Sequence, residues 1–404
     1  MPKFVFVVKD RNGKTHSGTL DAETRNALLE QLWKQELTVL SIEEQTKSSE
    51  TLNRLRAGQG KVRTSHLVIF SRQLATLVEA GVSIVPSLQI LADQTLDRQF
   101  KGIINKMHND VEAGSSLSEA AGRHPNAFSD LFVNLLQAGE SSGRLDEILD
   151  RLATYQEKSG ELQRKVKSAL IYPAFVTVLA FGITSFLMIV IVPKFKDIFA
   201  SLGGQLPLPT LMLLGLSEAM KRYWPLGLIA MIAAAIGIKV LLSTPTGRLR
   251  FDQVTLKVPV FGPLIQKVAI ARFSRTLATL IKSGVPILGA LDIVAKTAGN
   301  KVIEQAVVAA RASIREGENI SDPLAQSKVF PIMVTRMIAV GEKTGELEKM
   351  LTKVADFYES EVDAAVSGLT SLIEPLVIAF LGVVIGGIAV TLLLPVFSIT
   401  SLVK

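Results

Sequence analysis

The chain has 404 residues, of which 48% are hydrophobic, and its mean hydropathy is +0.35. Charged residues still make up 20%, so membrane segments can occupy only part of the chain. The net charge of +7 is spread along the sequence and forms no basic arm, which argues against nucleic-acid binding. The absence of cysteine excludes disulfides, thiolate metal ligands and thiol nucleophiles.

The first 45 residues predict a small α/β domain. The run FVFVV from Phe4 is typical of a strand, and Asn12-Gly13 indicates a tight turn before a second extended run. Asp21 is a plausible N-cap for an amphipathic helix, and VLSIEE closes the segment as a further strand. The start, MPKFVFVVKD, has no apolar core of signal-peptide length, so we expect a cytoplasmic N-terminus. Residues 46–64 are polar and basic and predict a linker.

Residues 65–168 predict a cytoplasmic helical bundle. In FSRQLATLVEAG, apolar residues recur from Phe70 with the spacing of one helix face, and Gly81 follows as a helix-ending glycine does. Two more helices are expected at 128–141 and 145–167, around a turn that contains glycine. Short polar loops favour antiparallel neighbours, so we expect about six helices in this bundle.

Three segments are apolar enough to cross a membrane, which takes about 20 residues as a helix. Residues 169–193 form an uncharged span, and residues 372–397 form a span that is uncharged from Pro375 onward. The middle candidate, 223–242, is interrupted by Lys239, which can reach the headgroups from a helix end. A buried amphipathic hairpin is the alternative for that middle segment. The last span carries a small-residue face of Gly382, Gly386 and Ala389, which suits close helix packing in lipid.

The chain contains an internal repeat. FSRQLATLVEAGVSIVPSLQILA from Phe70 and FSRTLATLIKSGVPILGALDIVA from Phe273 share 13 identities in 23 positions, at an offset of 203. AGESSGRLDEIL from Ala138 matches VGEKTGELEKML from Val340 at an offset of 202. The match continues through the spans, where the paired sites are Tyr172-Pro173 with Glu374-Pro375 and Val192-Pro193 with Leu394-Pro395. Residues 243–371 are therefore expected to form a second cytoplasmic bundle.

The repeat also predicts the topology. If both bundles are cytoplasmic, spans 169–193 and 372–397 both leave the cytoplasm, and one crossing must return the chain between them. The candidate at 223–242 supplies this crossing. Residues 194–222 and 398–404 are then periplasmic. Charge bias favours this orientation only weakly, because Lys194 and Lys196 follow the first span.

Glycines and two glutamates mark the repeated turns, and we interpret them as structural. They are Gly81, Gly284, Gly139, Glu140, Gly143, Gly341, Glu342 and Gly345. GEKTG at Gly341 is not a nucleotide-binding loop, because Arg336 stands where the first glycine should be and the sister copy, GESSG, has no lysine.

Residues suited to catalysis or metal binding are not gathered into a recognisable pattern. None of the four histidines lies three or four positions from another. Glu374, at the mouth of the last span, is aligned with Tyr172 and so forms no carboxylate pair by symmetry. We expect no catalytic residue, cofactor or metal, and therefore no enzyme.

The pattern FSRQLATLVEAGV…AGESSGRLDEIL…YP, repeated as FSRTLATLIKSGVPI…VGEKTGELEKML…EP, resembles the inner-membrane platform proteins of type IV pili and type II secretion systems. The resemblance covers nearly the whole chain. It implies a mainly α scaffold in the bacterial inner membrane, with a cytoplasmic hexameric ATPase, pilin or pseudopilin transmembrane helices and other inner-membrane assembly proteins as partners. It also implies a homo-oligomer without catalysis of its own.

Three functions remain open at this point. DFYESEVDAAVSGLTSLIEP is closer to the pilus-assembly branch, and the equivalent secretion platform is the alternative. A transporter with a parallel repeat would need polar or broken spans along a path. A membrane-bound enzyme would need a site that the sequence does not show.

Overall fold

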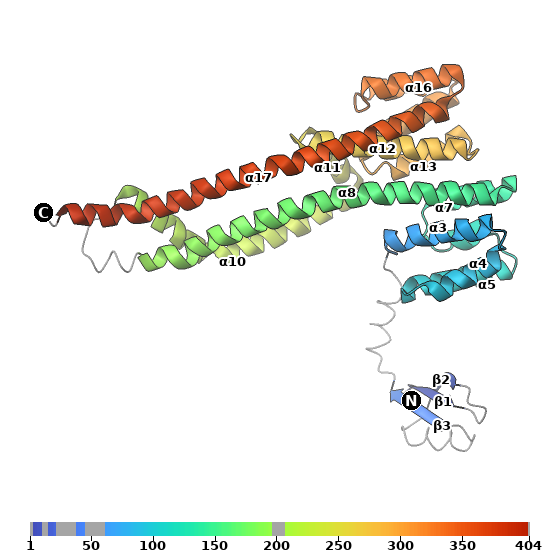
Figure 1. Ribbon diagram of the computed structural model, residues 1–404, viewed down its shortest axis with the longest axis horizontal. Helices are drawn as coiled ribbons and strands as arrows, with labels where there is room; N and C mark the ends of the chain where they lie inside the picture. Colours follow the sequence, from blue (N-terminus) through green and yellow to red (C-terminus); the bar gives the residue numbers. More distant parts are fainter. Residues whose placement is uncertain (1–2, 10–14, 22–37, 45–60, 196–206, 403–404) are drawn as a thin grey trace. The chain divides into compact units, whose positions relative to one another are not determined.

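The computed structural model describes residues 3–9, 15–21, 38–44, 61–195 and 207–402 (Figure 1). In these ranges the chain is mainly helical, as predicted. It divides into two compact units, which are described separately. The first comprises Met1–Leu67 and Ile84–Ser129, and the second comprises Val68–Ser83 and Asp130–Lys404.

Three strands of the first unit form an antiparallel sheet. Strand β1 (Lys3–Lys9) lies between β2 (Thr15–Asp21) and β3 (Thr38–Glu44). Its register pairs Phe4 with Leu20 on one side and with Glu44 on the other. The helix predicted after Asp21, the turn at 12–13 and most of the linker lie outside the described residues. The α/β domain therefore stays a prediction.

The first unit also contains three helices, two of which have capped starts. They are α4 (Ile84–Gln94), α5 (Arg98–Glu112) and α6 (Leu117–Gly122). Asp97 caps α5 by accepting the Phe100 N–H at 2.8 Å, and Ser116 with Glu119 forms a capping box on α6. Phe100 and Phe128 meet in the core with ring centroids 6.3 Å apart.

The second unit holds most of the helices that the structure describes. Its elements are α3 (Thr64–Glu79, mostly in this unit), α7 (Asp130–Ser142), α8 (Leu145–Phe186), the π-helical turn η1 (Leu187–Ile191), α10 (Leu208–Ser243), α11 (Pro245–Lys257), α12 (Phe261–Lys282), α13 (Ile287–Thr297), α14 (Lys301–Arg315), α15 (Ser321–Gln326), α16 (Ile332–Thr344) and α17 (Leu347–Leu402). In the second copy of the repeat, Phe273 packs edge-on against Phe330, with ring centroids 4.9 Å apart.

Two long helices, α8 and α17, each run from a bundle into a predicted span without a break. Figure 1 shows them side by side along much of their length. Pro173 and Pro375 lie inside these helices and do not end them. The junction between bundle and membrane is thus a point on one helix, whereas the sequence suggested two segments.

Three helical stretches of the described residues are long and apolar enough to cross a membrane, as predicted: Leu145–Phe195, Leu208–Ser243 and Leu347–Pro395. The pair α11 and α12 would give a fourth only as one broken span, because it is bent by 113°. Helix α12 belongs instead to the second bundle, since its Lys267 and Arg275 form ion pairs with α17.

Helix α10 starts earlier than the middle span predicted at 223–242. It begins at Leu208, inside the segment expected to be periplasmic. Its first turns pack on the ends of the other two spans, in a cluster of Met188, Val192, Leu214, Ile388 and Leu392. The chain turns after this span, because Thr244 ends α10 and caps α11 by accepting the Gly247 N–H.

Candidate functional site: the seam between the repeats

Arg72 fastens α3 to α8 in the first copy. Its guanidinium donates to both carboxylate oxygens of Glu157, at 2.6 and 2.8 Å, and to Asp150 at 2.6 Å. It also reaches the Thr154 hydroxyl at 3.1 Å. The fork geometry of arginine suits this bidentate contact. The hydrogen bond to Glu157 raises the pKa of Arg72, and the same bond lowers the pKa of Glu157.

Arg275 fastens α12 to α17 in the second copy in the same way. It donates to both oxygens of Glu359, at 2.8 and 2.9 Å, and to Asp356 at 2.6 Å. Burial lowers the pKa of Arg275, but hydrogen bonds to the two carboxylates outweigh burial and raise the pKa. We call the Arg72 and Arg275 groups the arginine clamps.

The second carboxylate of the clamp stands at a different position in each copy. Asp150 and Thr154 of the first copy correspond to Thr352 and Asp356 of the second at the offset of 202. The aspartate and the threonine have changed places one helical turn apart, and each clamp still has its second carboxylate. The charge pattern is therefore retained by a different arrangement of residues.

The seam is the set of contacts through which the first copy meets the second. The Tyr155 hydroxyl on α8 lies 3.1 Å from the Thr276 hydroxyl on α12, and Arg151 donates to the Lys282 carbonyl. Burial raises the pKa of Tyr155. A further ion pair, Lys296 with Asp130 at 2.8 Å, joins α13 to α7.

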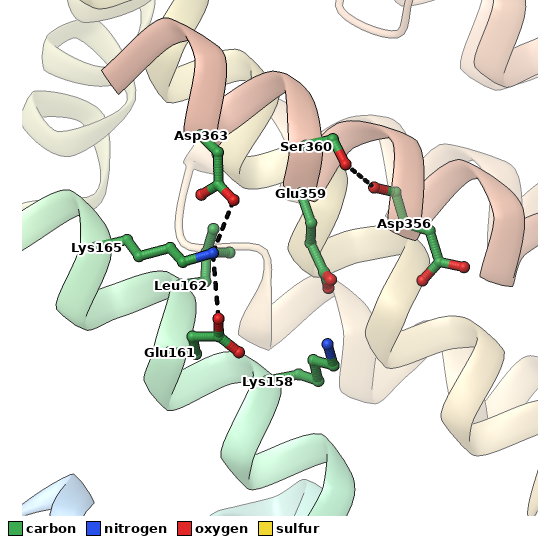
Figure 2. Close-up of a pocket in the computed structure, with 8 residues that line it drawn as sticks. All are labelled: Lys158, Glu161, Leu162, Lys165, Asp356, Glu359, Ser360 and Asp363. Atoms are coloured by element: carbon green, nitrogen blue, oxygen red, sulfur yellow. Dashed lines mark hydrogen bonds and ion pairs between the residues drawn. The ribbon is translucent and has the colours of Figure 1, made fainter. Parts of the chain in front are cut away.

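Nearer the membrane, the seam opens into a charged cavity of about 240 Å³ between α8 and α17 (Figure 2). Lys165 sits between Asp363 at 2.7 Å and Glu161 at 3.1 Å, and the hydrogen bonds that it donates to them, chiefly the one to Asp363, raise its pKa. The lining residues are Lys158, Glu161, Leu162, Lys165, Asp356, Glu359, Ser360 and Asp363. Small-molecule pockets are mostly apolar, so this lining suits an ion-pair network that couples the two helices. The described residues contain no group of three or more His, Cys, Asp or Glu arranged to hold a metal.

The predicted turn glycines lie at helix ends. Gly81 and Gly284 have φ of +84° and +79°, and the following N–H groups, from Val82 and Val285, return to carbonyls near the helix end. Gly143 and Gly345 also have positive φ. A left-handed residue is strained unless it is glycine, so these positions require one.

Gly139 and Gly341 have a different role from the predicted one. They lie inside α7 and α16 and let the next helix come close. A Cβ added at Gly341 would stand 2.8 Å from the Cα of Leu347, and one at Gly139 would stand 3.0 Å from the Cβ of Ile148. In both helix pairs, the two helices can therefore approach closely because glycine has no side chain at the point of contact.

Glu342 binds backbone at the start of α15. Its carboxylate accepts the N–H groups of Ile320 and, at 3.2 Å, of Ser321. A carboxylate at this end of a helix satisfies donors that lack helical partners. Glu140, the counterpart of Glu342 in the first copy, lies on α7 and also contacts a partner.

The small-residue face of α17 is open. Gly382, Gly386 and Ala389 are all exposed, and no atom lies within 4 Å of a Cβ built at either glycine. The face is available to another helix, and its use stays a prediction.

Two hydroxyls of α10 were missed by reasoning from the sequence. Proline has no N–H, so Pro395 leaves the carbonyl of Thr391, four residues earlier, without its helical donor. The buried Thr210 hydroxyl donates to that carbonyl at 2.8 Å. The signal that could have found this contact is the repeated proline at 193 and 395.

Pro193 creates the same vacancy in the first span. Val192 bonds five residues back, to the Leu187 carbonyl, in the π-helical turn. The carbonyl of Met188 would need the N–H of residue 193, which proline lacks. The buried Ser217 hydroxyl donates to it instead.

Comparison with known proteins matches both copies of the repeat to one family. The family profile of type II secretion system protein F covers residues 70–193 and again 273–395, and the profile of its N-terminal domain covers residues 1–43. The chain belongs to the type II secretion system protein F family.

Curated members of the protein F family are similar over nearly the full chain. The type IV pilus assembly protein PilC of Thermus thermophilus is 45% identical over 99% of this chain and 98% of its own length, and PilC of Myxococcus xanthus is 42% identical over 100% and 96%. The type II secretion system protein F of Vibrio cholerae is 31% identical over 100% of both. The family resemblance predicted from the sequence is confirmed.

Proposed function

We propose that this chain is the inner-membrane platform protein of a type IV pilus assembly machine. The observation that carries the proposal is the higher identity to the pilus assembly relatives, 42 to 45%, than to the secretion relative, 31%. The equivalent platform of a type II secretion system is the second candidate, because the secretion relative also matches over its full length.

The architecture supports a coupling role. Each copy of the repeat joins a bundle to a span through one continuous helix, and the arginine clamps fix that helix to its bundle. A partner that binds the cytoplasmic bundles therefore acts on the same helices that meet lipid. We infer that a cytoplasmic hexameric ATPase binds the bundles, and that pilin helices and other inner-membrane assembly proteins meet the spans.

The proposal also includes the domain boundaries and the orientation of the chain in the membrane. We assign residues 1–45 to a small α/β domain, in agreement with the match of the N-terminal family profile to residues 1–43. The N-terminus is cytoplasmic, and 65–168 and 243–371 form the cytoplasmic parts. The chain has no catalytic site of its own and draws its energy from the ATPase.

Complementation tests the choice of branch. The gene is expressed in a pilus-platform deletion strain and in a secretion-platform deletion strain, each paired with the cognate ATPase and pilins. We expect fibres in the first and no secretion in the second. Restored secretion without fibres would overturn the pilus assignment.

We place pilin packing on the open face of α17. A leucine at Gly386 would fill the space that a partner helix needs, so Gly386→Leu should reduce fibre output at unchanged protein level. Gly237→Leu on α10, also an open glycine in a span, is the matched control. Equal fibre output from Gly386→Leu and the wild type would remove pilin from this face.

A further inference from the structure

Four helices of the second unit follow one another in a row, α3–α8–α12–α17. The first and last joins are the arginine clamps, Arg72 to Glu157 and Arg275 to Glu359. The middle join is the seam, where Tyr155 meets Thr276. Joins within a copy therefore alternate with a join between copies in this row, which ends at α3 and at α17. Nearer the membrane, α17 also packs directly on α8.

The outer face of α3 is exposed wherever its counterpart on α12 is covered. On α12, the seam covers Arg272, Thr276, Thr279 and Ser283 wholly or partly. At the offset of 203, these positions correspond on α3 to Ile69, Gln73, Thr76 and Ala80, which are all exposed. Ile69 is 56% exposed. We call this the α3 face.

The opposite end of the row shows the same difference. On α7 and α8, the seam partly covers Asn134, Ala138, Arg151 and Tyr155. Their counterparts on α16 and α17 are Arg336, Val340, Lys353 and Phe357, which are all exposed. Val340 is 48% and Phe357 is 49% exposed. We call this the α16/α17 face.

We propose that the α16/α17 face of one chain binds the α3 face of a second copy of the same chain. Within the chain, the counterparts of these two faces already bind each other at the seam. The contact between chains would repeat this contact, with Phe357 in the place of Tyr155 and Gln73 in the place of Thr276. The α3 face of one chain is thus occupied by the α16/α17 face of the next chain.

Charge supports this pairing. At the seam, Arg151 lies over the backbone of Lys282. The counterparts of these two residues are Lys353 and Glu79, both exposed and of opposite sign. At this place the seam has an arginine bound to a carbonyl, whereas the contact between chains would have an ion pair of Lys353 with Glu79. This ion pair favours the proposed register over a contact between two α3 faces.

A contact between two different faces is heterologous, so it builds a ring or an open row. Every chain in it has the same orientation in the membrane, as the shared direction of the spans requires. This inference deepens the homo-oligomer part of the proposed function and rests on it. It does not depend on which fibre or ATPase the platform serves.

Cysteine cross-linking tests the contact directly, because the chain has no cysteine of its own. Cysteines are placed at Gln73→Cys and Phe357→Cys in the full-length protein, which is oxidised in native membranes and separated without reductant. We expect a ladder of dimers and higher species from the double variant. Each single variant alone should give monomers, since residue 73 meets residue 357 and not itself.

Two further variants make the result decisive. The first, Tyr155→Cys with Thr276→Cys, places the two cysteines across the seam inside one chain and shows whether this contact accepts a disulfide. The second, Gln73→Cys with Val308→Cys, measures cross-linking by random collision with another exposed helix. A seam disulfide without a ladder from 73 and 357 would overturn the proposal, and so would dimers from Gln73→Cys alone. The readout is independent of fibre output, so failure here leaves the complementation result standing.

Charge reversal gives a second readout that needs no disulfide. Glu79→Lys and Lys353→Glu should each lower the oligomer size of the detergent-purified protein in light scattering, and the double variant should restore it. Failure of the double variant to restore oligomers that both single variants lose would reject the pairing of 79 with 353.

Discussion

Glu157 shows how a single side chain ties stability to pH. Its hydrogen bond from Arg72 lowers its pKa in the folded protein. Its contribution to stability is therefore complete above the unfolded carboxyl pKa of about 4.3, and it is lost as the pH falls through the folded pKa. The pair is partly exposed, so its contribution is below about 1 kcal/mol.

We predict that Glu157→Gln lowers the thermal stability at pH 7 by this small amount and that the gap narrows as the pH falls below the unfolded carboxyl pKa of about 4.3. Thermal unfolding of the two proteins in detergent from pH 7 to 3 measures the gap. Glu346→Gln, which removes an exposed partner of Lys349, is the control and should show no such convergence. A gap that stayed constant down to pH 3 would exclude the assignment to Glu157.

Gly341 is a second residue whose effect is predictable. Because a Cβ there meets the backbone of Leu347 at 2.8 Å, Gly341→Ala must push α16 and α17 apart, at a cost of about 1–3 kcal/mol. Gly368→Ala, in an open stretch of α17, should instead stabilise by about 0.5–1 kcal/mol. Denaturant unfolding of both variants checks the opposite signs, and a stabilised Gly341→Ala would refute the close approach.

At the scale of elements, α10 binds the other two spans at the carbonyls that Pro193 and Pro395 leave without a helical donor. Thr210→Val keeps the shape and removes the hydroxyl, which leaves the Thr391 carbonyl without a donor and should cost about 1–3 kcal/mol. Thr370→Val is the control, because the hydroxyl there binds a carbonyl inside a regular helix, that of Val366.

A double variant separates this explanation from lost packing. Pro395→Ala restores the N–H that proline lacks, so the effect of Thr210→Val should be much smaller in the Pro395→Ala background. Thermal unfolding of the four proteins gives the coupling energy. Additive effects would mean that the hydroxyl does not serve the proline.

The elements themselves were largely predictable, whereas their contacts were not. The spacing from Phe70 and the glycine at 81 gave the end of α3, and the apolar runs gave three spans. The early start of α10 was missed because Glu218, Lys221 and Arg222 interrupt its apolar sequence, so that the uncharged run begins only at residue 223. The Thr210 contact joins residues 181 positions apart, and no local pattern encodes it.

The clamps illustrate the same limit at the candidate site. The repeated Phe-Ser-Arg was visible in the sequence, but the residues that Arg72 and Arg275 bind were not, because the partner aspartate occupies different positions in the two copies. Gly139 and Gly341 were predicted as turn residues, and only the structure shows that they serve helix packing.

At the scale of the whole molecule, the parallel repeat demands a return crossing through α10. We predict that a reporter fused after residue 205 is periplasmic and one fused after residue 260 is cytoplasmic. Alkaline phosphatase and green fluorescent protein fusions at both sites measure this. The same side at both sites would remove α10 from the list of spans. If that side were the periplasm, the second copy would lie outside the cytoplasm.

The unbroken length of α17 sets the scale of movement open to the molecule. Its 56 residues extend about 84 Å at 1.5 Å per residue. A tilt of only about 4° about one end would displace the other by roughly one helical pitch of 5.4 Å. Small angular changes in the bundles thus become displacements as large as the step between successive turns of a neighbouring helix in the membrane.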